Sequence, residues 1–125
     1  MQPSQSKARR GENGWTSLHH AAHHGDLSAV EDIINFCPDC LELVDSEGMN
    51  FFHVAAKFER IQVVKHVLGG KKIPDSVLNM QDNNGNTPLH IAALTGNESL
   101  TLCLLYDINV NKMTVNKNGQ HVLHA

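Results

Sequence analysis

Four histidines near the N-terminus have the spacing of paired metal ligands. His19 and His23 lie four residues apart, as do His20 and His24, which would place each pair on one face of a helix, as zinc ligands are placed. In zinc proteases a glutamate directly follows the first histidine, whereas His20 and Ala21 occupy those positions here. Because two ligands rarely hold a metal, we expect histidines that are exposed or packed on a helix. A metal-binding protein using His20 and His24 stays an alternative.

A second candidate for chemistry is the Cys-x-x-Cys motif of Cys37 and Cys40. A redox site places this motif at a helix N-terminus, where the dipole stabilises the thiolate. Here the motif follows an apolar helical stripe, so it lies at a C-terminal end, which opposes thiolate formation. The chain has three cysteines, an odd number that gives no disulfide framework. We therefore expect structural cysteines in a reducing, cytoplasmic setting, with a redox protein as the alternative.

The overall composition excludes several classes of function. The formal net charge is −3 and 5% of the residues are aromatic, so the chain lacks the basic field and the stacking surface that nucleic-acid binding needs. No apolar run approaches the roughly 18–20 residues that cross a bilayer, and the N-terminus lacks the apolar segment of a secretory signal. No phosphate-binding loop or glycine-flanked serine is present. We expect a protein that is not an enzyme, needs no cofactor and inserts into no membrane through this segment.

Several of the histidines belong to a pattern that recurs along the chain. Four glycines are each followed five residues later by a histidine: Gly14 and His19, Gly48 and His53, Gly85 and His90, and Gly119 and His124. The glycines are 34, 37 and 34 residues apart, a period typical of repeat proteins, whose units stack because none buries its apolar face alone. We expect each of these histidines to be structural and to bond to the backbone of the adjoining turn.

The third copy of the pattern carries a family resemblance. Residues 87–92 read Thr-Pro-Leu-His-Ile-Ala, which resembles the Thr-Pro-Leu-His-x-Ala signature of the ankyrin repeat. The resemblance implies an all-α solenoid of helix–turn–helix units with β-turn tips, and a scaffold that binds protein partners. It extends over residues 11–125, with units of about 14–47, 48–84 and 85–118, a partial unit at 119–125 and a short disordered lead at 1–10. Because the pattern stops inside a fourth unit, a truncated gene product without independent function is a further alternative.

Local sequence signals agree with two helices in each unit. In the third unit Thr87 can cap the first helix through its hydroxyl, Pro88 suits the first turn, and Gly96 can end the helix in the left-handed conformation. Apolar stripes predict the second helices, at Val30, Ile33 and Ile34, at Val63, Val64, Val67 and Leu68, and at Leu100, Leu104 and Leu105.

The second unit departs from the pattern in three ways. Glu59 replaces the helix-ending glycine and is a weaker stop. Phe51 and Phe52 put bulk where the pattern usually has smaller residues. Residues 69–74 predict an irregular, longer loop between stacked units.

A narrower resemblance concerns residues 37–56. They are similar to the linker and repeat of plant ankyrin membrane proteins of the accelerated-cell-death type, which carry a C-terminal PGG domain. In that family cytosolic repeats precede several membrane spans, and members act in defence, cell-death and salt signalling. The resemblance implies that this segment is the cytosolic part of such a parent protein, at the cytosolic face of a membrane such as the plasma membrane.

The ankyrin resemblance also implies where a protein partner binds. Ankyrin arrays use their turn tips and inner-helix faces as a concave surface. Carried onto this sequence, the contact positions are Asn13, Trp15, Glu47, Met49, Asn84 and Asn86 at the tips, and His23, His24, Lys57, Phe58, Leu94 and Thr95 along the inner helices. We expect Trp15, Met49 and Phe58 to face solvent, where large side chains are frequent binding hot spots.

Overall fold

The computed structural model describes residues 12–70 and 73–120. Over these residues the chain forms helices joined by turns, with no β-strand, which confirms the predicted all-α class. The elements are the 3-10 helix η1 (Glu12–Gly14), α2 (Ser17–His24), α3 (Leu27–Phe36), the 3-10 helix η2 (Pro38–Glu42), α4 (Phe51–Lys57), α5 (Ile61–Gly70), α6 (Asp75–Leu78), α7 (Pro88–Thr95) and α8 (Glu98–Leu105).

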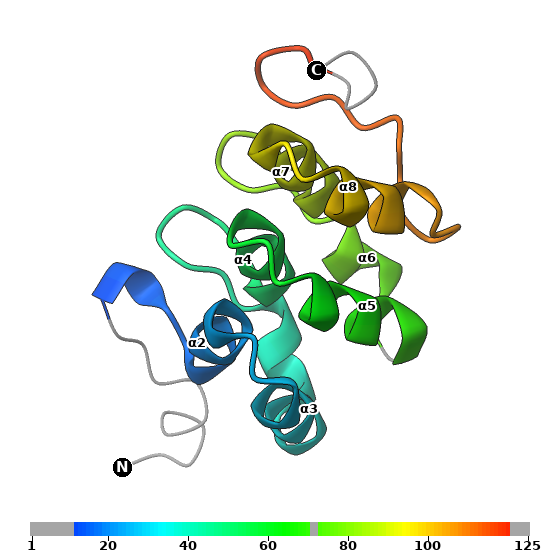
Figure 1. Ribbon diagram of the computed structural model, residues 1–125. Helices are drawn as coiled ribbons and strands as arrows, with labels where there is room; N and C mark the ends of the chain where they lie inside the picture. The colour runs from blue at the N-terminus through cyan, green and yellow to red at the C-terminus, as the bar shows by residue number, and fades with distance from the viewer. Residues whose placement is uncertain (1–11, 71–72, 121–125) are drawn as a thin grey trace.

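The helices form two layers (Figure 1). The inner helices α2, α4 and α7 contact one another in that order, and the outer helices α3, α5 and α8 do the same. The turns that precede α4 and α7 project away from the outer helices, toward the left of Figure 1. Stacked helix pairs with projecting turns are the arrangement that the repeated sequence predicts.

Each inner helix begins with the same kind of cap. The side chains of Thr16, Asn50 and Thr87 accept a hydrogen bond from the backbone N–H of the histidine three residues further on. Pro88 occupies the first turn of α7, as predicted. A cap of this kind stabilises a helix by about 1 kcal/mol, so the repeated sequence determines where the inner helices start.

Each inner helix is followed, within two residues of its end, by a residue in the left-handed conformation. Gly25 follows α2 with a φ of 70°, and Gly96 follows α7 with a φ of 76°, which confirms the prediction for Gly96. After α4 this conformation falls on Glu59, whose φ is 58°. A side chain with a Cβ atom is disfavoured there by about 1–2 kcal/mol. Glu59 is therefore less favourable than glycine at this position after the helix, although α4 still ends at Lys57.

The core lies between the inner and outer layers. Phe51 and Phe52 of α4 are 1% and 0% exposed, so the bulk of the second unit fills the centre of the molecule. Burying a phenylalanine side chain contributes roughly 1.5–3 kcal/mol. The predicted stripes of the outer helices face this core: Val30, Ile34, Val63, Val64, Val67, Leu100 and Leu104 are buried, and Ile33, Leu68 and Leu105 are partly buried.

The connections between the helix pairs are more regular than expected. The prediction of an irregular loop over residues 69–74 is wrong in part, because Gly69 and Gly70 complete α5 and α6 begins at Asp75. A helix can extend through two glycines here because its neighbouring turns are held by the packed Val63, Val64 and Val67. Both short connecting helices bury two side chains, Cys40 and Leu41 in η2 and Val77 and Leu78 in α6.

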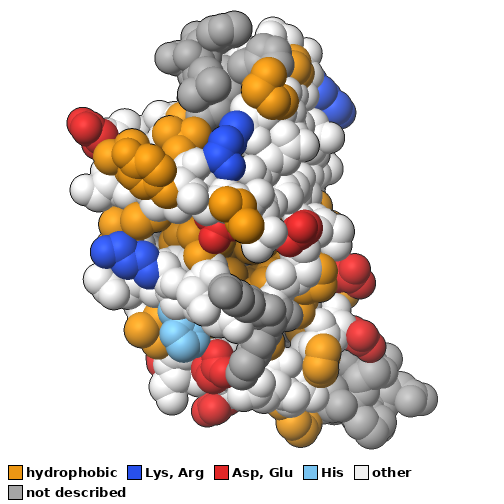
Figure 2. Space-filling view, turned by 90° about the vertical axis from the view of Figure 1, so that its right-hand side faces the viewer, with side chains coloured by type: hydrophobic (Ala, Val, Ile, Leu, Met, Phe, Trp, Pro, Cys, Tyr) orange, Lys and Arg blue, Asp and Glu red, His pale blue; other side chains and the backbone are white. Residues whose placement is uncertain are grey.

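The outer face carries apolar side chains among charged ones (Figure 2). Apolar side chains are spread over this face. The exposed large apolar residues of the described chain include Leu102 in α8 and Tyr106, Ile108 and Met113 after it. Within residues 12–70 and 73–120, no helix has both the length and the apolar character needed to cross a membrane.

Candidate functional site

The turns that precede α4 and α7, and the similar turn after α8, are built alike. We call residues 12–14, 45–49, 82–86 and 116–120 the tips. In the second tip the N–H groups of Glu47 and Met49 donate to Oδ1 of Asp45, at 2.8 and 3.0 Å. Asp82 and Asn116 accept the same pair of bonds, from the residues two and four positions further on. The tips are therefore held in shape by their own side chains.

Neighbouring tips are also bonded to one another. A backbone N–H of each tip donates to a carbonyl of the preceding one, from Ser46 to Asn13 at 2.9 Å, from Asn83 to Glu47 at 3.0 Å, and from Lys117 to Asn84 at 3.0 Å. We call these bonds the tip row. Close approach requires glycine at Gly85, where a Cβ atom would come within 2.8 Å of the Lys117 nitrogen.

The recurring histidines are structural, as predicted for His19, His53 and His90. Nδ1 of each ring accepts a backbone N–H from the cap residue three positions earlier, at 3.1–3.2 Å. Because a backbone N–H is always a donor, Nδ1 carries no proton and the proton lies on Nε2. Nε2 then donates to a carbonyl of the following tip, at 2.8, 2.9 and 3.0 Å. His124 lies outside the described residues.

The central histidine, His53, lies in surroundings that disfavour its charged form. The pKa of His53 is lowered from its ordinary value of 6.5, because burial removes the ring from water. Its bond to the Asn86 carbonyl and the charge of Asp82 act in the opposite direction but are weaker causes. The neutral ring is therefore the form that the fold selects, in agreement with the single proton that its hydrogen bonds require.

Trp15 lies across the beginning of the inner surface. Its indole Nε1 donates to Oδ2 of Asp45 at 3.0 Å. Its ring centroid lies 5.2 Å from that of His23 and 6.1 Å from that of Phe58, and His23 and Phe58 are 4.4 Å apart. All three side chains are half-buried. We call Trp15, His23 and Phe58 the aromatic patch; it brings together residues from before α2, from the end of α2 and from the end of α4.

Two of the predicted contact residues are buried. Met49 is 6% exposed and Asn86 is 8% exposed, so the expectation that Met49 faces solvent is wrong. Each is the fourth residue after the side-chain acceptor of its tip, and its carbonyl accepts from the histidine of the preceding helix pair. These two bonds hold Met49 and Asn86 beneath their tips. Met49 joins the core there, and the side chain of Asn86 accepts a hydrogen bond from that of Asn116.

The remaining predicted positions are at the surface. Asn13, His24, Glu47, Lys57, Asn84 and Leu94 are exposed, and Trp15, His23, Phe58 and Thr95 are half-buried. Trp15 and Phe58 thus face solvent with only part of their area, because they pack on His23 and on each other. Lys57 connects the tips to the patch: its Nζ lies 3.9 Å from Oε1 of Glu47 and 5.7 Å from the centre of the Phe58 ring.

The histidine cluster forms no metal site in the described part of the chain. No group of three histidine, cysteine, aspartate or glutamate side chains is placed to hold an ion there. His20 instead makes a T-shaped contact with Trp15, with ring centroids 5.0 Å apart, and His24 contacts His23 at 4.9 Å. The rings of His19, His20 and His23 thus lie around Trp15.

Cys37 and Cys40 form a disulfide. The expectation that the cysteines give no disulfide is wrong for this pair, whereas Cys103 is unpaired with another cysteine. The motif does follow the C-terminal end of α3, as predicted, but Cys37 also precedes η2, which returns Cys40 toward it. A proline directly after the first cysteine, typical of a helix start, is the signal in the sequence that could have indicated this turn.

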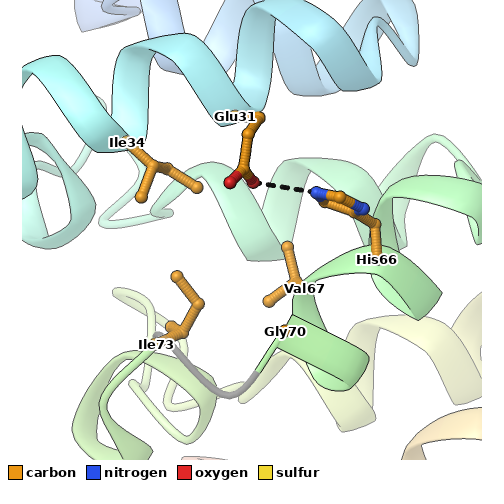
Figure 3. Close-up of a pocket in the computed structure, with 6 residues that line it drawn as sticks. All are labelled: Glu31, Ile34, His66, Val67, Gly70 and Ile73. Carbon is orange, nitrogen blue, oxygen red and sulfur yellow. Dashed lines mark hydrogen bonds and ion pairs between the residues drawn. The ribbon is translucent and has the colours of Figure 1, made fainter.

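A small hollow between α3 and α5 is lined by Glu31, Ile34, His66, Val67, Gly70 and Ile73 (Figure 3). Its volume of about 20 Å³ has room for roughly one water molecule. Glu31 and His66 face each other across it, with Oε2 and Nε2 2.9 Å apart. This pair joins the first two outer helices. The hollow itself is too small for a ligand.

Comparisons with known proteins agree with this geometry. The sequence matches the family described as ankyrin repeats (3 copies) over residues 2–77, and the family described as ankyrin repeats (many copies) over residues 70–105. It is 30% identical to target of rapamycin complex 2 subunit AVO2 of Saccharomyces cerevisiae over 115 residues, which are 91% of this chain and 26% of that protein.

Two animal proteins show similar likeness. The human transient receptor potential cation channel subfamily A member 1 is 31% identical over 94 residues, 74% of this chain and 8% of the channel. Mouse rabankyrin-5 is 31% identical over 106 residues, 84% of this chain and 9% of that protein. The chain spans about a quarter or less of the length of these relatives.

The family match agrees with the repeated helix pairs of the structure. Residues 2–77 alone make up more than half of the chain, and within the described residues the helix pairs, histidine caps and joined tips repeat in register with it. The chain belongs to the ankyrin-repeat family.

Proposed function

We propose that this segment is a protein-interaction scaffold that holds a partner on its inner surface, formed by the tips and the inner helices. Ankyrin repeats typically serve as interaction modules without enzymatic activity of their own. In this proposal the stacked units are about 14–47, 48–84 and 85–118. The observation that carries the proposal is the aromatic patch, because half-buried aromatic rings at a surface are frequent anchors of binding energy.

The construction of the tips supports this function. Asp45, Asp82 and Asn116 hold their own tips, and the tip row fixes the position of each tip against the next. A surface that is already ordered loses less conformational entropy when a partner binds. The exposed side chains of Asn13 and Leu94 then extend the contact surface toward both ends of the array.

We further propose that the module is the cytosolic part of a plant membrane protein with a role in signalling or defence. Support comes from the likeness of residues 37–56 to the plant family with a PGG domain. In this proposal the rest of the parent protein supplies the membrane anchor, and the repeats lie at the cytosolic face. Protease treatment of sealed membrane vesicles containing the full-length protein would test this placement, because cleavage of the repeats from the cytosolic side supports it and protection contradicts it.

The binding surface is tested by comparing two sets of variants. A Trp15→Ala, Phe58→Ala double variant removes two rings of the patch, and Tyr106→Ala removes an 80% exposed ring at the end of the outer helix α8. Partners are captured from plant extract, identified, purified and titrated by calorimetry, after circular dichroism shows that the variants are helical. We expect the double variant to bind about 30-fold or more weakly, as for a hot spot, and Tyr106→Ala to bind normally. Equal binding by both would place the site elsewhere.

A further inference from the structure

The aromatic patch has cationic side chains on two sides. On the side of the tips, Nζ of Lys57 lies 5.7 Å from the centre of the Phe58 ring. On the other side, Nε of Arg60 donates to the carbonyl of His23 at 2.6 Å, which brings the guanidinium to the end of α2. Each of these groups keeps N–H donors beyond the contacts that position it.

Asp45 and Glu59, two anionic side chains nearby, accept hydrogen bonds from neighbouring groups. Oδ1 of Asp45 accepts two tip amides and its Oδ2 accepts the Trp15 indole N–H. Oε1 of Glu59 accepts from the side chain of Asn97 at 3.1 Å. Glu47 approaches Lys57 only to 3.9 Å, with the two side chains 60% and 45% exposed. Such an open, long pair contributes little and leaves Lys57 available to another carboxylate.

Basic side chains also lie near His23. Its pKa is lowered from the ordinary value of 6.5, first because burial removes the ring from water. The further causes are repulsion by His24, Arg60 and His20, in that order, and all three are basic side chains. Lys57 and Arg60 are therefore the positive groups beside the patch, among the carboxylates of Asp45, Glu47 and Glu59, and a partner's negative charge can pair with them.

A hollow beside the patch offers room for a partner side chain. It has a volume of about 290 Å³ between the end of α2 and the start of α5, and is lined by His24, Gly25, Glu59, Arg60, Ile61, Gln62 and Val63. Its wall thus combines apolar surface with the side chains of His24, Arg60 and Glu59. Glu59 accepts a hydrogen bond from the side chain of Asn97. A side chain that enters from the patch would meet Arg60 there.

We propose that the aromatic patch binds a peptide segment of the partner in which an aromatic or long apolar side chain is flanked by acidic residues. The apolar side chain packs on Trp15 and Phe58, and the carboxylates pair with Lys57 and Arg60. This inference rests on the proposed function, because it gives the chemistry of the partner that the inner surface would hold. Aromatic groups supply the contact area and the flanking charges supply orientation and selectivity.

Peptide selection tests the inference directly. A random library of twelve-residue peptides is displayed and selected on the purified chain, with counter-selection on the Trp15→Ala, Phe58→Ala double variant. We expect the enriched peptides to contain aspartate or glutamate within about two positions of an aromatic or leucine residue. Enrichment of basic or uncharged peptides would overturn the inference, and so would a failure to enrich any peptide.

A synthetic copy of the best peptide then measures the individual contacts. Trp15 is the only tryptophan, so its fluorescence reports binding at the patch. We expect Lys57→Gln to weaken binding about fivefold to tenfold and Lys65→Gln, on the outer helix α5, to leave it unchanged. Raising the ionic strength from about 0.05 to 0.5 M should weaken binding of the acidic peptide, because screening shortens the reach of exposed charges. A control peptide has asparagine and glutamine in place of the acidic residues. It should bind weakly, and with equal affinity, to the original protein and to the Lys57→Gln variant.

The outcomes separate this inference from the proposed function. Peptides whose affinity is unchanged by the patch substitutions but is lowered by Asn84→Ala or Leu94→Ala would contradict the acidic–aromatic inference. They would still support a binding site on the inner surface. Binding that survives all of these inner-surface changes would contradict both. The capture experiment on the natural partner decides the proposed function independently of the library.

Discussion

The indole N–H of Trp15 bonds to Oδ2 of Asp45, whereas the corresponding oxygen of Asp82, in the next tip, is buried with no partner among the described residues. Met49 occupies the position in the second unit that Trp15 occupies in the first, and a thioether has no N–H to donate. At the third junction the side chains of Asn86 and Asn116 bond to each other at 2.8 Å. This side-chain position thus carries a bonded pair at the first and third junctions and leaves Oδ2 of Asp82 without a donor at the second.

Replacing Trp15 by phenylalanine keeps an aromatic ring and removes the indole N–H. Oδ2 of Asp45 would then lose its donor, so we expect the free energy of unfolding to fall by about 1–2 kcal/mol. Urea denaturation followed by circular dichroism measures the change. The double variant Trp15→Phe, Asp45→Asn is the control, because removing the charge should recover part of the loss; an unchanged midpoint in Trp15→Phe would contradict the role of the bond.

Replacing Met49 by glutamine should supply the donor that Asp82 lacks. The two side chains are similar in length, and a hydrogen bond to a carboxylate contributes about 1.5–3 kcal/mol against the loss of apolar burial. We expect Met49→Gln to be more stable than the original by about 1 kcal/mol, measured by urea denaturation. Met49→Leu keeps the burial without the donor and should show no gain. A Met49→Gln protein less stable than Met49→Leu would show that the amide does not reach Asp82.

Acidification should destabilise the array through His53. Its pKa is below 6.5 in the folded chain, whereas the unfolded chain titrates near the ordinary value. Because the unfolded state then binds the proton more readily, the stabilising contribution is complete above about pH 6.5 and falls as the pH drops below it, toward the folded pKa. Urea unfolding at about pH 7.5 and 5.0 should show a larger acid loss for the original than for His53→Gln. An equal loss in both would assign the acid sensitivity to other groups.

Replacing Glu59 by glycine should relieve the left-handed conformation after α4. The φ of 58° is unfavourable for glutamate and free for glycine, although the change also removes the exposed bond to Asn97. We expect a net gain of about 0.5–1 kcal/mol, seen as a higher midpoint of thermal unfolding. Glu59→Ala loses the same bond without gaining backbone freedom, so it should be less stable than the original. A gain in both variants would point to charge, not conformation.

The disulfide should support the connection after α3 and leave the inner surface unaffected. A closed loop as short as that between Cys37 and Cys40 is expected to add at most about 2 kcal/mol. Cys37→Ser, Cys40→Ser should therefore unfold at lower urea concentration and bind the selected peptide with unchanged affinity. Reducing agent should lower the stability of the original and not that of the variant. A change in peptide affinity would connect the redox state to binding and support the redox alternative.

The sequence predicts most of the fold because its strongest signals are local. Thr87 and Pro88 start a helix and Gly96 ends one through bonds within a few residues, and the structure has them in these roles. The burial of Met49 was missed because it depends on a bond from His19 in the preceding helix pair. The pairing of Cys37 with Cys40 depends on the turn of η2, a short helix that no apolar periodicity marks.

The candidate site could be predicted only in outline. Repeat position predicts His23, Lys57 and Phe58 at the inner surface, and in the structure they lie at the ends of the inner helices α2 and α4. Position alone does not indicate that Trp15 folds back across α2 to His23, because that orientation is set by its bond to Asp45, 30 residues away. The direction of a side chain at a tip therefore depends on the next tip, which sequence spacing does not describe.

The hydrogen bonds between neighbouring repeats are unevenly distributed across the two layers. The tip row and the histidine-to-carbonyl bonds lie on the inner side, whereas the outer helices α3 and α5 share the more exposed pair of Glu31 and His66. Asn79, after α6, also bonds to Asn109 and Asn111 after α8, but the inner side has more of these bonds, so we expect the array to be stiffer along its inner edge than along its outer edge. A force that bends it would separate the outer helices first, while the spacing of the tips stays nearly constant. Strain applied to this protein would thus be absorbed on the side opposite to the proposed binding surface.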